Sequence, residues 1–154
     1  MNYGIYKLIC EKYKAKYSEN QALSQYTSFK IGGSCPLLIK PNSVECLCEL
    51  MSAFAENGHS YKVMGKGSNL LISDKGIDCP VMLISSDLGK MRFDGDTVTC
   101  QSGLSLISLC SEAANRELSG LEFAYGIPGS VGGAVYMNAG AYGGEMRDKI
   151  VSCP

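Results

Sequence analysis

The chain has 154 residues, of which 19% are charged, and carries a formal charge of −1 at neutral pH. A chain of this length is expected to form one domain with its own hydrophobic core. Its balanced charge gives neither a basic field for nucleic acid nor an acidic tail, so the expected partners are small molecules or other proteins.

Eight cysteines suggest a disulfide framework, but the start of the chain argues against secretion. The stretch MNYGIYKLICEKYKAKY has neither the apolar core nor the cleavage site of a signal peptide, so a reduced, cytoplasmic protein is expected. Cys46 and Cys48 lie two residues apart on a predicted helix, where their side chains diverge, and no metal site is expected. No run of residues reaches the roughly 20 apolar residues of a membrane span.

The first predicted elements are a helix and a strand. Tyr3–Tyr17 has apolar residues at helical spacing, and the polar stretch Ser18–Gln25 is predicted to end that helix. Tyr26–Gly33 is prone to β structure and stops in two glycines, and a strand is predicted at Leu37–Lys40.

A second helix is predicted over Val44–Ala55, with Ser43 as its N-cap and Gly58 just beyond its C-terminal end. The single histidine, His59, follows this helix, and a loop or capping role is expected for it. Tyr61–Met64 is then predicted to be a short strand.

Strand signals continue at Leu70–Ser73 and Pro80–Ile84, and a hairpin is predicted from Lys90–Phe93 and Thr97–Gln101 around an Asp-Gly-Asp turn. Helical spacing returns over Ser105–Glu117. Strands and helices alternate without a strict βαβ rhythm, which favours the α+β class over a doubly wound sheet.

Two glycine-rich stretches carry the candidate chemistry: Gly65–Leu71 (GKGSNLL) and Gly120–Glu145 (GLEFAYGIPGSVGGAVYMNAGAYGGE). In the second stretch the glycines stand among apolar residues, so it is not a polar linker. Glycine at this density marks backbone that is approached closely, either by a ligand or by another segment.

The first stretch follows a predicted strand, so its glycines allow successive N–H groups to turn toward one point as an anion nest. Ser68 and Asn69 add donors and Lys66 adds charge, which would suit a diphosphate. The nucleotide-binding P-loop and Rossmann motifs do not fit, because Lys66 is followed by Gly67 and the third Rossmann glycine position is Leu70. An ordinary turn between strands is the alternative.

In the second stretch, Pro128 and Gly129 predict a turn and Ser130 is the predicted cap of a short helix. Exposed N–H groups at the start of that helix would attract phosphate. A second bend is predicted at Asn138–Gly144, where Tyr142 either flanks a flat ring or packs at the rim of a site. The stretch's two glutamates, Glu122 and Glu145, are expected to cap or face solvent and not to form a catalytic pair.

These two stretches, together with Tyr26–Gly33, closely resemble the flavin-binding region of the UDP-N-acetylenolpyruvoylglucosamine reductases, which make UDP-N-acetylmuramate for peptidoglycan. The resemblance covers roughly Leu23 to Ile150. It implies the α+β FAD-binding fold of the vanillyl alcohol oxidase or PCMH type, truncated in its second subdomain. Residues 1–22 would be an N-terminal helical extension, and residues 23–154 an FAD-binding domain without the family's substrate-binding domain.

The resemblance also implies three groups of FAD-binding residues. They are Gly65, Lys66, Gly67, Ser68, Asn69 and Leu70 around the pyrophosphate; Ile127, Pro128, Gly129, Ser130, Gly132 and Gly133 on the diphosphate and ribityl side; and Asn138, Gly140, Ala141 and Tyr142 near the flavin and the substrate pocket. NADPH would be the hydride donor, and a nucleotide sugar with an enolpyruvyl group would be the substrate.

The family's catalytic arginine, serine and glutamate lie downstream of the matched region, so no catalytic residue is assigned and no reductase turnover is expected from these residues alone. Lys149–Pro154 reads as the beginning of a strand. The chain is therefore expected to be cut in mid-domain and to self-associate through the exposed sheet edge.

Two alternatives stay open. The first is an oxidase of the same fold, in which a histidine often tethers the flavin, although His59 does not lie in a comparable motif. The second is a glycine-rich binding module without enzymatic activity.

Overall fold

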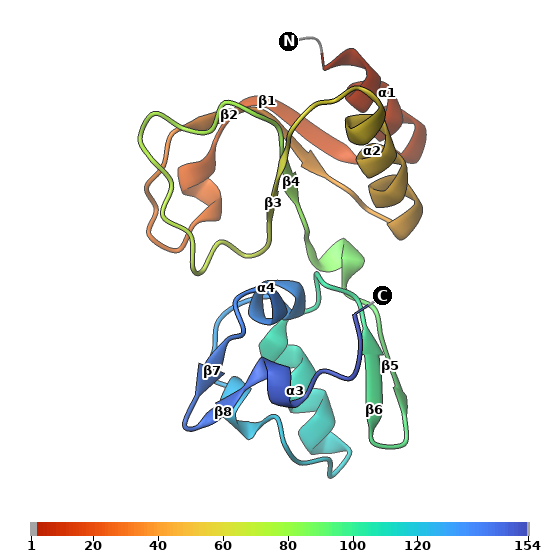
Figure 1. Ribbon diagram of the computed structural model, residues 1–154, viewed down its shortest axis with the longest axis vertical. Coiled ribbons are helices and arrows are strands. Elements are labelled where there is room, and N and C mark those ends of the chain that lie inside the picture. Colours follow the sequence, from red (N-terminus) through yellow and green to blue (C-terminus); the bar gives the residue numbers. More distant parts are fainter. Residues whose placement is uncertain (1–2, 154) are drawn as a thin grey trace. The chain divides into compact units, whose positions relative to one another are not determined.

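The computed structural model describes residues 3–153. Met1 and Asn2, which begin the expected extension, and Pro154, which ends the expected final strand, lie outside the described residues. The contacts divide the chain into two units, residues 1–88 and residues 89–154, and each unit is described by itself (Figure 1).

The first unit is built on a four-stranded sheet in the order β1-β2-β4-β3. Its strands are β1 (Lys16–Ala22), β2 (Ser34–Lys40), β3 (Lys62–Met64) and β4 (Val81–Leu83). β1 runs antiparallel to β2, with Lys16 opposite Lys40, whereas β2 and β3 both run parallel to β4. The strands predicted within Leu37–Lys40, Tyr61–Met64 and Pro80–Ile84 are confirmed.

Side chains of the two central strands alternate between two apolar clusters. Leu37 and Ile39 of β2 face the cluster under helices α1 (Gly4–Tyr13) and α2 (Val44–Glu56), where Tyr6 stacks on Phe54 with ring centroids 3.9 Å apart. Leu38 belongs to the other cluster, with Ile72 and residues of a 3₁₀ helix at Leu23–Tyr26. The segment that follows β3 therefore contributes to covering the second face of the sheet.

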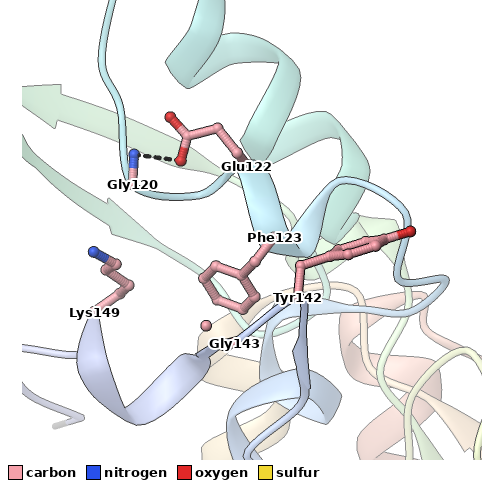
Figure 2. A pocket seen from close by; sticks show the side chains of 7 residues that line it. Gly120, Glu122, Phe123, Tyr142, Gly143 and Lys149 are labelled. Atoms are coloured by element: carbon pink, nitrogen blue, oxygen red, sulfur yellow. Dashed lines mark hydrogen bonds between the residues drawn. The ribbon is translucent and has the colours of Figure 1, made fainter.

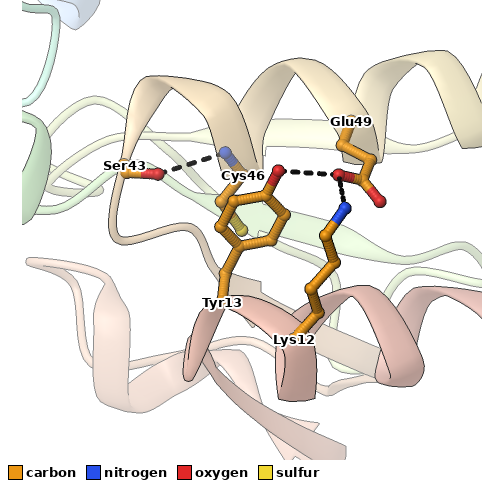
Figure 3. Close-up of polar contacts among 5 residues, drawn as sticks. All are labelled: Lys12, Tyr13, Ser43, Cys46 and Glu49. Carbon is orange, nitrogen blue, oxygen red and sulfur yellow. Dashed lines mark hydrogen bonds and ion pairs between the residues drawn. The ribbon is translucent and has the colours of Figure 1, made fainter.

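Helix α2 begins and ends as its sequence predicts. The Ser43 hydroxyl accepts a hydrogen bond from the Cys46 N–H at 3.1 Å, and Gly58 adopts a φ of +62° just beyond the C-cap. Figure 3 shows how α1 reaches α2: Lys12 Nζ and Tyr13 Oη both donate to Glu49, at 2.6 and 2.7 Å. These hydrogen bonds, that from Lys12 first, lower the pKa of the Glu49 carboxyl below its ordinary value.

The N-terminal prediction is wrong in its second half. The helix predicted over Tyr3–Tyr17 ends at Tyr13, because Lys14 adopts a left-handed φ of +54°, and Lys16–Ala22 is strand β1. β1 is a half-exposed edge strand whose side chains lack alternation, so its pairing with β2 was not visible in the sequence. α1 and β1 lie within the first unit, which extends to Leu88. The division into an N-terminal extension over residues 1–22 and an FAD-binding domain over residues 23–154 stays a prediction.

Two further segments of the first unit, one β-prone and one predicted as a strand, form no strand. Tyr26–Gly33 contains no strand, because Leu23–Tyr26 is a 3₁₀ helix and the following residues form a loop. Leu70–Ser73 is also a loop. The two segments are β-prone in sequence, but instead of joining the sheet they lie against each other, as described below.

The second unit contains two hairpins and two helices. They are β5 (Met91–Asp94), β6 (Thr97–Cys100), α3 (Leu106–Asn115), α4 (Val131–Tyr136), β7 (Gly140–Ala141) and β8 (Gly144–Glu145), with 3₁₀ turns at Ser86–Leu88 just before the unit and at Glu122–Ala124 and Met146–Asp148 within it. Its core gathers Leu106 and Leu109 of α3, Phe123, Val131 and Met146.

The predicted hairpin and the helix within Ser105–Glu117 are confirmed, and Gly95 takes the positive φ that the hairpin turn requires. The strand predicted at the end of the chain is wrong for the residues described, because 149–153 form no strand and pair with no strand among the described residues.

All eight cysteines are free thiols. Cys46 is buried whereas Cys48 is exposed, so the predicted divergence of this pair is confirmed. Among residues 3–153, no three potential metal ligands lie together, and no helix is long and apolar enough to cross a membrane.

Candidate functional site

The glycine loop, Gly65–Leu71, begins where β3 ends in the first unit. The Gly67 carbonyl accepts a hydrogen bond from the Ser28 N–H at 3.1 Å. The N–H groups of Gly65, Gly67 and Asn69 make no hydrogen bond within the described part of the chain. Three backbone donors in five residues thus have no protein partner there, with Gly65 half-buried, Gly67 buried and Asn69 exposed; an anion nest uses such closely spaced donors.

Gly67 also has a packing reason to be glycine. It adopts a φ of +66°, and a Cβ built on it would lie 2.0 Å from the Tyr26 carbonyl oxygen. The close approach predicted for this glycine is thus made by another segment of the same unit. This packing uses the Gly67 carbonyl and leaves the N–H groups of Gly65, Gly67 and Asn69 without a partner among the described residues, so it is compatible with a ligand.

The start of α4 differs from its prediction. Ser130 is the N-cap, as expected, and its hydroxyl accepts from the Gly133 N–H at 3.3 Å. The Val131 N–H donates to the Leu104 carbonyl at 2.8 Å, and the Gly132 N–H donates to the Ser102 carbonyl at 2.9 Å. The expectation of exposed N–H groups at this terminus is wrong, because the loop before α3 supplies carbonyls to them.

Close packing explains one glycine of α4 as well. A Cβ on Gly132 would lie 2.5 Å from Ser102 Cβ, so this glycine serves the contact between two loops. The role assigned to Ile127, Pro128, Gly129, Ser130, Gly132 and Gly133 in holding a cofactor stays a prediction. To hold a cofactor, these residues would have to use groups other than the N–H groups of Val131, Gly132 and Gly133, which already donate within the unit.

The bend after α4 is a two-residue hairpin between β7 and β8. Tyr142 and Gly143 occupy its centre with φ values of +51° and +83°, the pattern of a type I′ turn. The Tyr142 side chain is 98% exposed. Asn138 is engaged internally, since its amide donates to Glu145 at 2.5 Å and its oxygen accepts from the Arg147 N–H.

A groove of about 460 Å³ opens beside this hairpin in the second unit (Figure 2). It is lined by Gly120, Glu122, Phe123, Tyr142, Gly143, Gly144 and Lys149. Glu122 accepts a hydrogen bond from the Gly120 N–H in the preceding loop at 2.8 Å. Backbone hydrogen bonds from its own N–H and that of Gly120, together with the charge of Lys149, lower the Glu122 pKa. Lys149 and Phe123 belong to no recognisable local motif, so the sequence did not mark them as site residues.

His59 has a structural role. Its Nδ1 lies 2.7 Å from the Tyr6 hydroxyl, and Tyr6 is fully buried in the core under α1 and α2. The loop role predicted for this histidine is confirmed. The contact provides no support for a covalent link between His59 and a cofactor.

Comparison with protein families decides the family. The family model described as "FAD binding domain" matches residues 36–153. The chain belongs to this family. As an FAD binding domain, it also resembles solved structures: the UDP-N-acetylenolpyruvylglucosamine reductase of Thermus caldophilus covers 87% of this chain with 35% identity and a TM-score of 0.69. A solvent-stable cholesterol oxidase, 17% identical with a TM-score of 0.63, shows the same fold. The predicted α+β FAD-binding fold is confirmed.

Relatives named UDP-N-acetylenolpyruvoylglucosamine reductase match this FAD binding domain over most of its length. The protein of Pseudothermotoga lettingae is 48% identical over 131 residues, which are 85% of this chain and 44% of the relative. That of Bacillus subtilis is 41% identical over 141 residues, 92% of this chain and 46% of the relative. The resemblance seen in the sequence is confirmed, and the chain spans less than half the length of the relatives it matches.

Proposed function

We propose that this chain is the FAD-binding part of an NADPH-dependent reductase that converts UDP-N-acetylglucosamine enolpyruvate to UDP-N-acetylmuramate. The family match and the 41–48% identity to proteins named as this reductase support the proposal. FAD binding by this chain is supported above all by the glycine loop. The N–H groups of Gly65, Gly67 and Asn69 in that loop have no protein partner among the described residues.

The loop fits the diphosphate of FAD by the chemistry of its donors. Backbone N–H groups bind phosphate oxygens without introducing a charge that must be buried, and Lys66 would add a cation beside them. Ser68 and Asn69 would contribute side-chain donors. Leu70 would be the last residue of the loop that surrounds the diphosphate. The loop contains no acidic side chain that would repel the negative charge of the diphosphate.

Bound FAD would supply hydride transfer, with NADPH as the donor and the enolpyruvyl group as the acceptor. The work of this chain would be to bind and orient the cofactor. Asn138, Gly140, Ala141 and Tyr142 of the hairpin bend are proposed to lie near the flavin and the substrate. The exposed Tyr142 offers an aromatic face that a ligand could cover.

The test is a titration of the chain with FAD and with riboflavin, following flavin fluorescence and the visible spectrum. Riboflavin has the same ring but no diphosphate, so it is expected to bind at least about tenfold more weakly if the loop holds the diphosphate through charge-assisted hydrogen bonds. ADP is expected to compete with FAD. Equal affinity for both flavins, or no binding of FAD, would refute the proposal.

A matched pair of variants locates the site. Asn69→Asp places a negative charge on the exposed side of the loop and is expected to weaken FAD binding about tenfold, because it repels the diphosphate. Asn20→Asp makes the same change of charge at an exposed position of β1 and is the control. Equal affinities for the two variants would place the cofactor elsewhere.

The remaining parts of the proposal rest on the same similarity to the reductases. A nucleotide-sugar substrate and a cytoplasmic location are proposed, and the 154 residues alone are expected to oxidise no NADPH with the enolpyruvyl substrate. Self-association is also proposed, although residues 149–153 do not form the terminal strand on which this expectation was based. Measurable turnover would contradict the expected lack of activity, and a single monomer in sedimentation would contradict self-association.

A further inference from the structure

A second loop lies against the glycine loop in the first unit and holds it through backbone hydrogen bonds. The brace loop, Tyr26–Gly33, donates from the Ser28 N–H to the Gly67 carbonyl at 3.1 Å and from the Gly33 N–H to the Ser73 carbonyl at 2.8 Å. Just beyond it, the Ile77 N–H donates to the Ser34 carbonyl at 2.9 Å. Two segments far apart in sequence are thereby joined from the glycine loop to the start of β2.

Three glycines permit this close contact between the two backbone segments. A Cβ on Gly67 would lie 2.0 Å from the Tyr26 carbonyl oxygen, and one on Gly33 would lie 2.3 Å from the Asp74 carbonyl oxygen. A Cβ on Gly76 would lie 2.0 Å from the Ser34 carbonyl oxygen. The two backbones are in direct contact, so the conformation of the glycine loop depends on the position of the brace loop.

One buried hydroxyl closes the brace loop. Thr27 is 2% exposed, and its Oγ1 donates to the Ile31 carbonyl at 3.0 Å. The Lys30 N–H donates back to the Thr27 carbonyl at 3.2 Å, with Lys30 in the left-handed region at φ +59°. Apart from the Tyr6 hydroxyl, the buried hydroxyl side chains among residues 3–153 are Thr27 and Ser130; Thr27 lies in the segment that contacts the glycine loop, and Ser130 lies within the second glycine-rich stretch.

We propose that the brace loop is a positioning element for diphosphate binding, and that Thr27 is the positioning residue on which it depends. The buried Thr27 hydroxyl holds Ile31, the closed loop presents the Ser28 N–H to Gly67, and the Gly67 carbonyl is kept turned into the protein. The N–H groups of Gly65, Gly67 and Asn69 then make no hydrogen bond within the described part of the unit. The ligand side of this inference rests on the proposed function, with the diphosphate of FAD as the bound group.

The test compares Thr27→Val, which keeps the shape and removes the hydroxyl, with Thr27→Ser, which keeps the hydroxyl. Thr99→Val, at an exposed position of β6, is the control for loss of a threonine hydroxyl. Amide hydrogen exchange of the ligand-free chain is expected to speed up about five- to tenfold at Ser28 and Gly33 in Thr27→Val. Thr27→Ser is expected to restore most of the protection, and amides between β1 and β2 are expected to be unchanged.

FAD titration of the same variants gives the second readout. Affinity is expected to fall about tenfold in Thr27→Val and to recover in Thr27→Ser. Unchanged exchange at Ser28 and Gly33 would overturn the positioning role. Faster exchange with unchanged FAD affinity would show that the brace loop does not serve the binding loop.

If the unaltered chain binds no FAD, the proposed function fails and the ligand side of this inference fails with it, whereas the exchange measurement still decides whether Thr27 holds the loop. If Thr27→Val does not fold, Ser28→Pro removes the N–H that donates to Gly67 without touching the buried hydroxyl. Amide hydrogen exchange at Gly33 and FAD titration of Ser28→Pro then test whether the brace loop positions the glycine loop.

Discussion

Replacing Gly67 by alanine tests whether this glycine is required by protein packing. The added Cβ would lie 2.0 Å from the Tyr26 carbonyl oxygen and 2.9 Å from the end of the Met64 side chain. The methionine can move, but the carbonyl belongs to the backbone, so the two segments must separate by about 1 Å to reach a tolerated 3.0 Å.

Three costs add in this variant. A left-handed φ of +66° costs an L-residue about 1 kcal/mol, and loss of the Ser28 N–H bond to Gly67 costs about 1 kcal/mol more. Displacement of the packed segments adds about 1–3 kcal/mol. Gly67→Ala is therefore expected to lower the free energy of unfolding by about 3–5 kcal/mol, with a fall in Tm of roughly 10 °C or more.

The matched control is Gly58→Ala in the same unit. Gly58 has nearly the same φ, +62°, but a Cβ there would meet nothing within 4 Å. This variant is expected to lose only the backbone cost of about 1 kcal/mol. Urea unfolding of both variants, followed by circular dichroism, gives the comparison. If Gly67→Ala is no more destabilising than Gly58→Ala, the packing argument is refuted.

Three further predictions concern single contacts. The Glu49 pKa is lowered by hydrogen bonds from α1, so its stabilisation is full above the unfolded-state pKa of about 4.3 and is lost as the pH falls through the lower folded value. Glu49→Gln is therefore expected to reduce the drop in urea midpoint between about pH 7 and about pH 3, and a drop equal to that of the exposed control Glu56→Gln would contradict this. Ser130→Ala removes the cap of α4 and is expected to lower the free energy of unfolding by about 1 kcal/mol, so an unchanged urea midpoint would count against it. Cys48 is expected to react with a thiol reagent in the folded chain, whereas Cys10, whose pKa burial raises to about 12, is expected to react only on unfolding. Mass spectrometry that finds Cys10 labelled in the folded chain would contradict the last expectation.

The candidate site was predictable where its signals are local. The motif GKGSNLL after a strand predicted an anion loop, and the structure leaves its N–H groups at Gly65, Gly67 and Asn69 without partners in the described residues. The start of α4 was not predictable in the same way. Ser130 was correctly read as a cap, but the carbonyls that take the next N–H groups come from the loop before α3, and no pattern near Ser130 announces them.

The fold likewise has features that nearby residues specify and features that depend on distant partners. Ser43 and Gly58 define the ends of α2, and Gly95 defines the turn of the β5–β6 hairpin, because caps and tight turns are specified by residues within a few positions of one another. These features were determined by the sequence itself. Only the tertiary structure decided that Lys16–Ala22 is an edge strand and that Tyr26–Gly33 is a brace and not a strand. Both outcomes depend on backbone partners that are distant along the chain, and hydrogen bonds to such partners override the weak β propensity of a short segment.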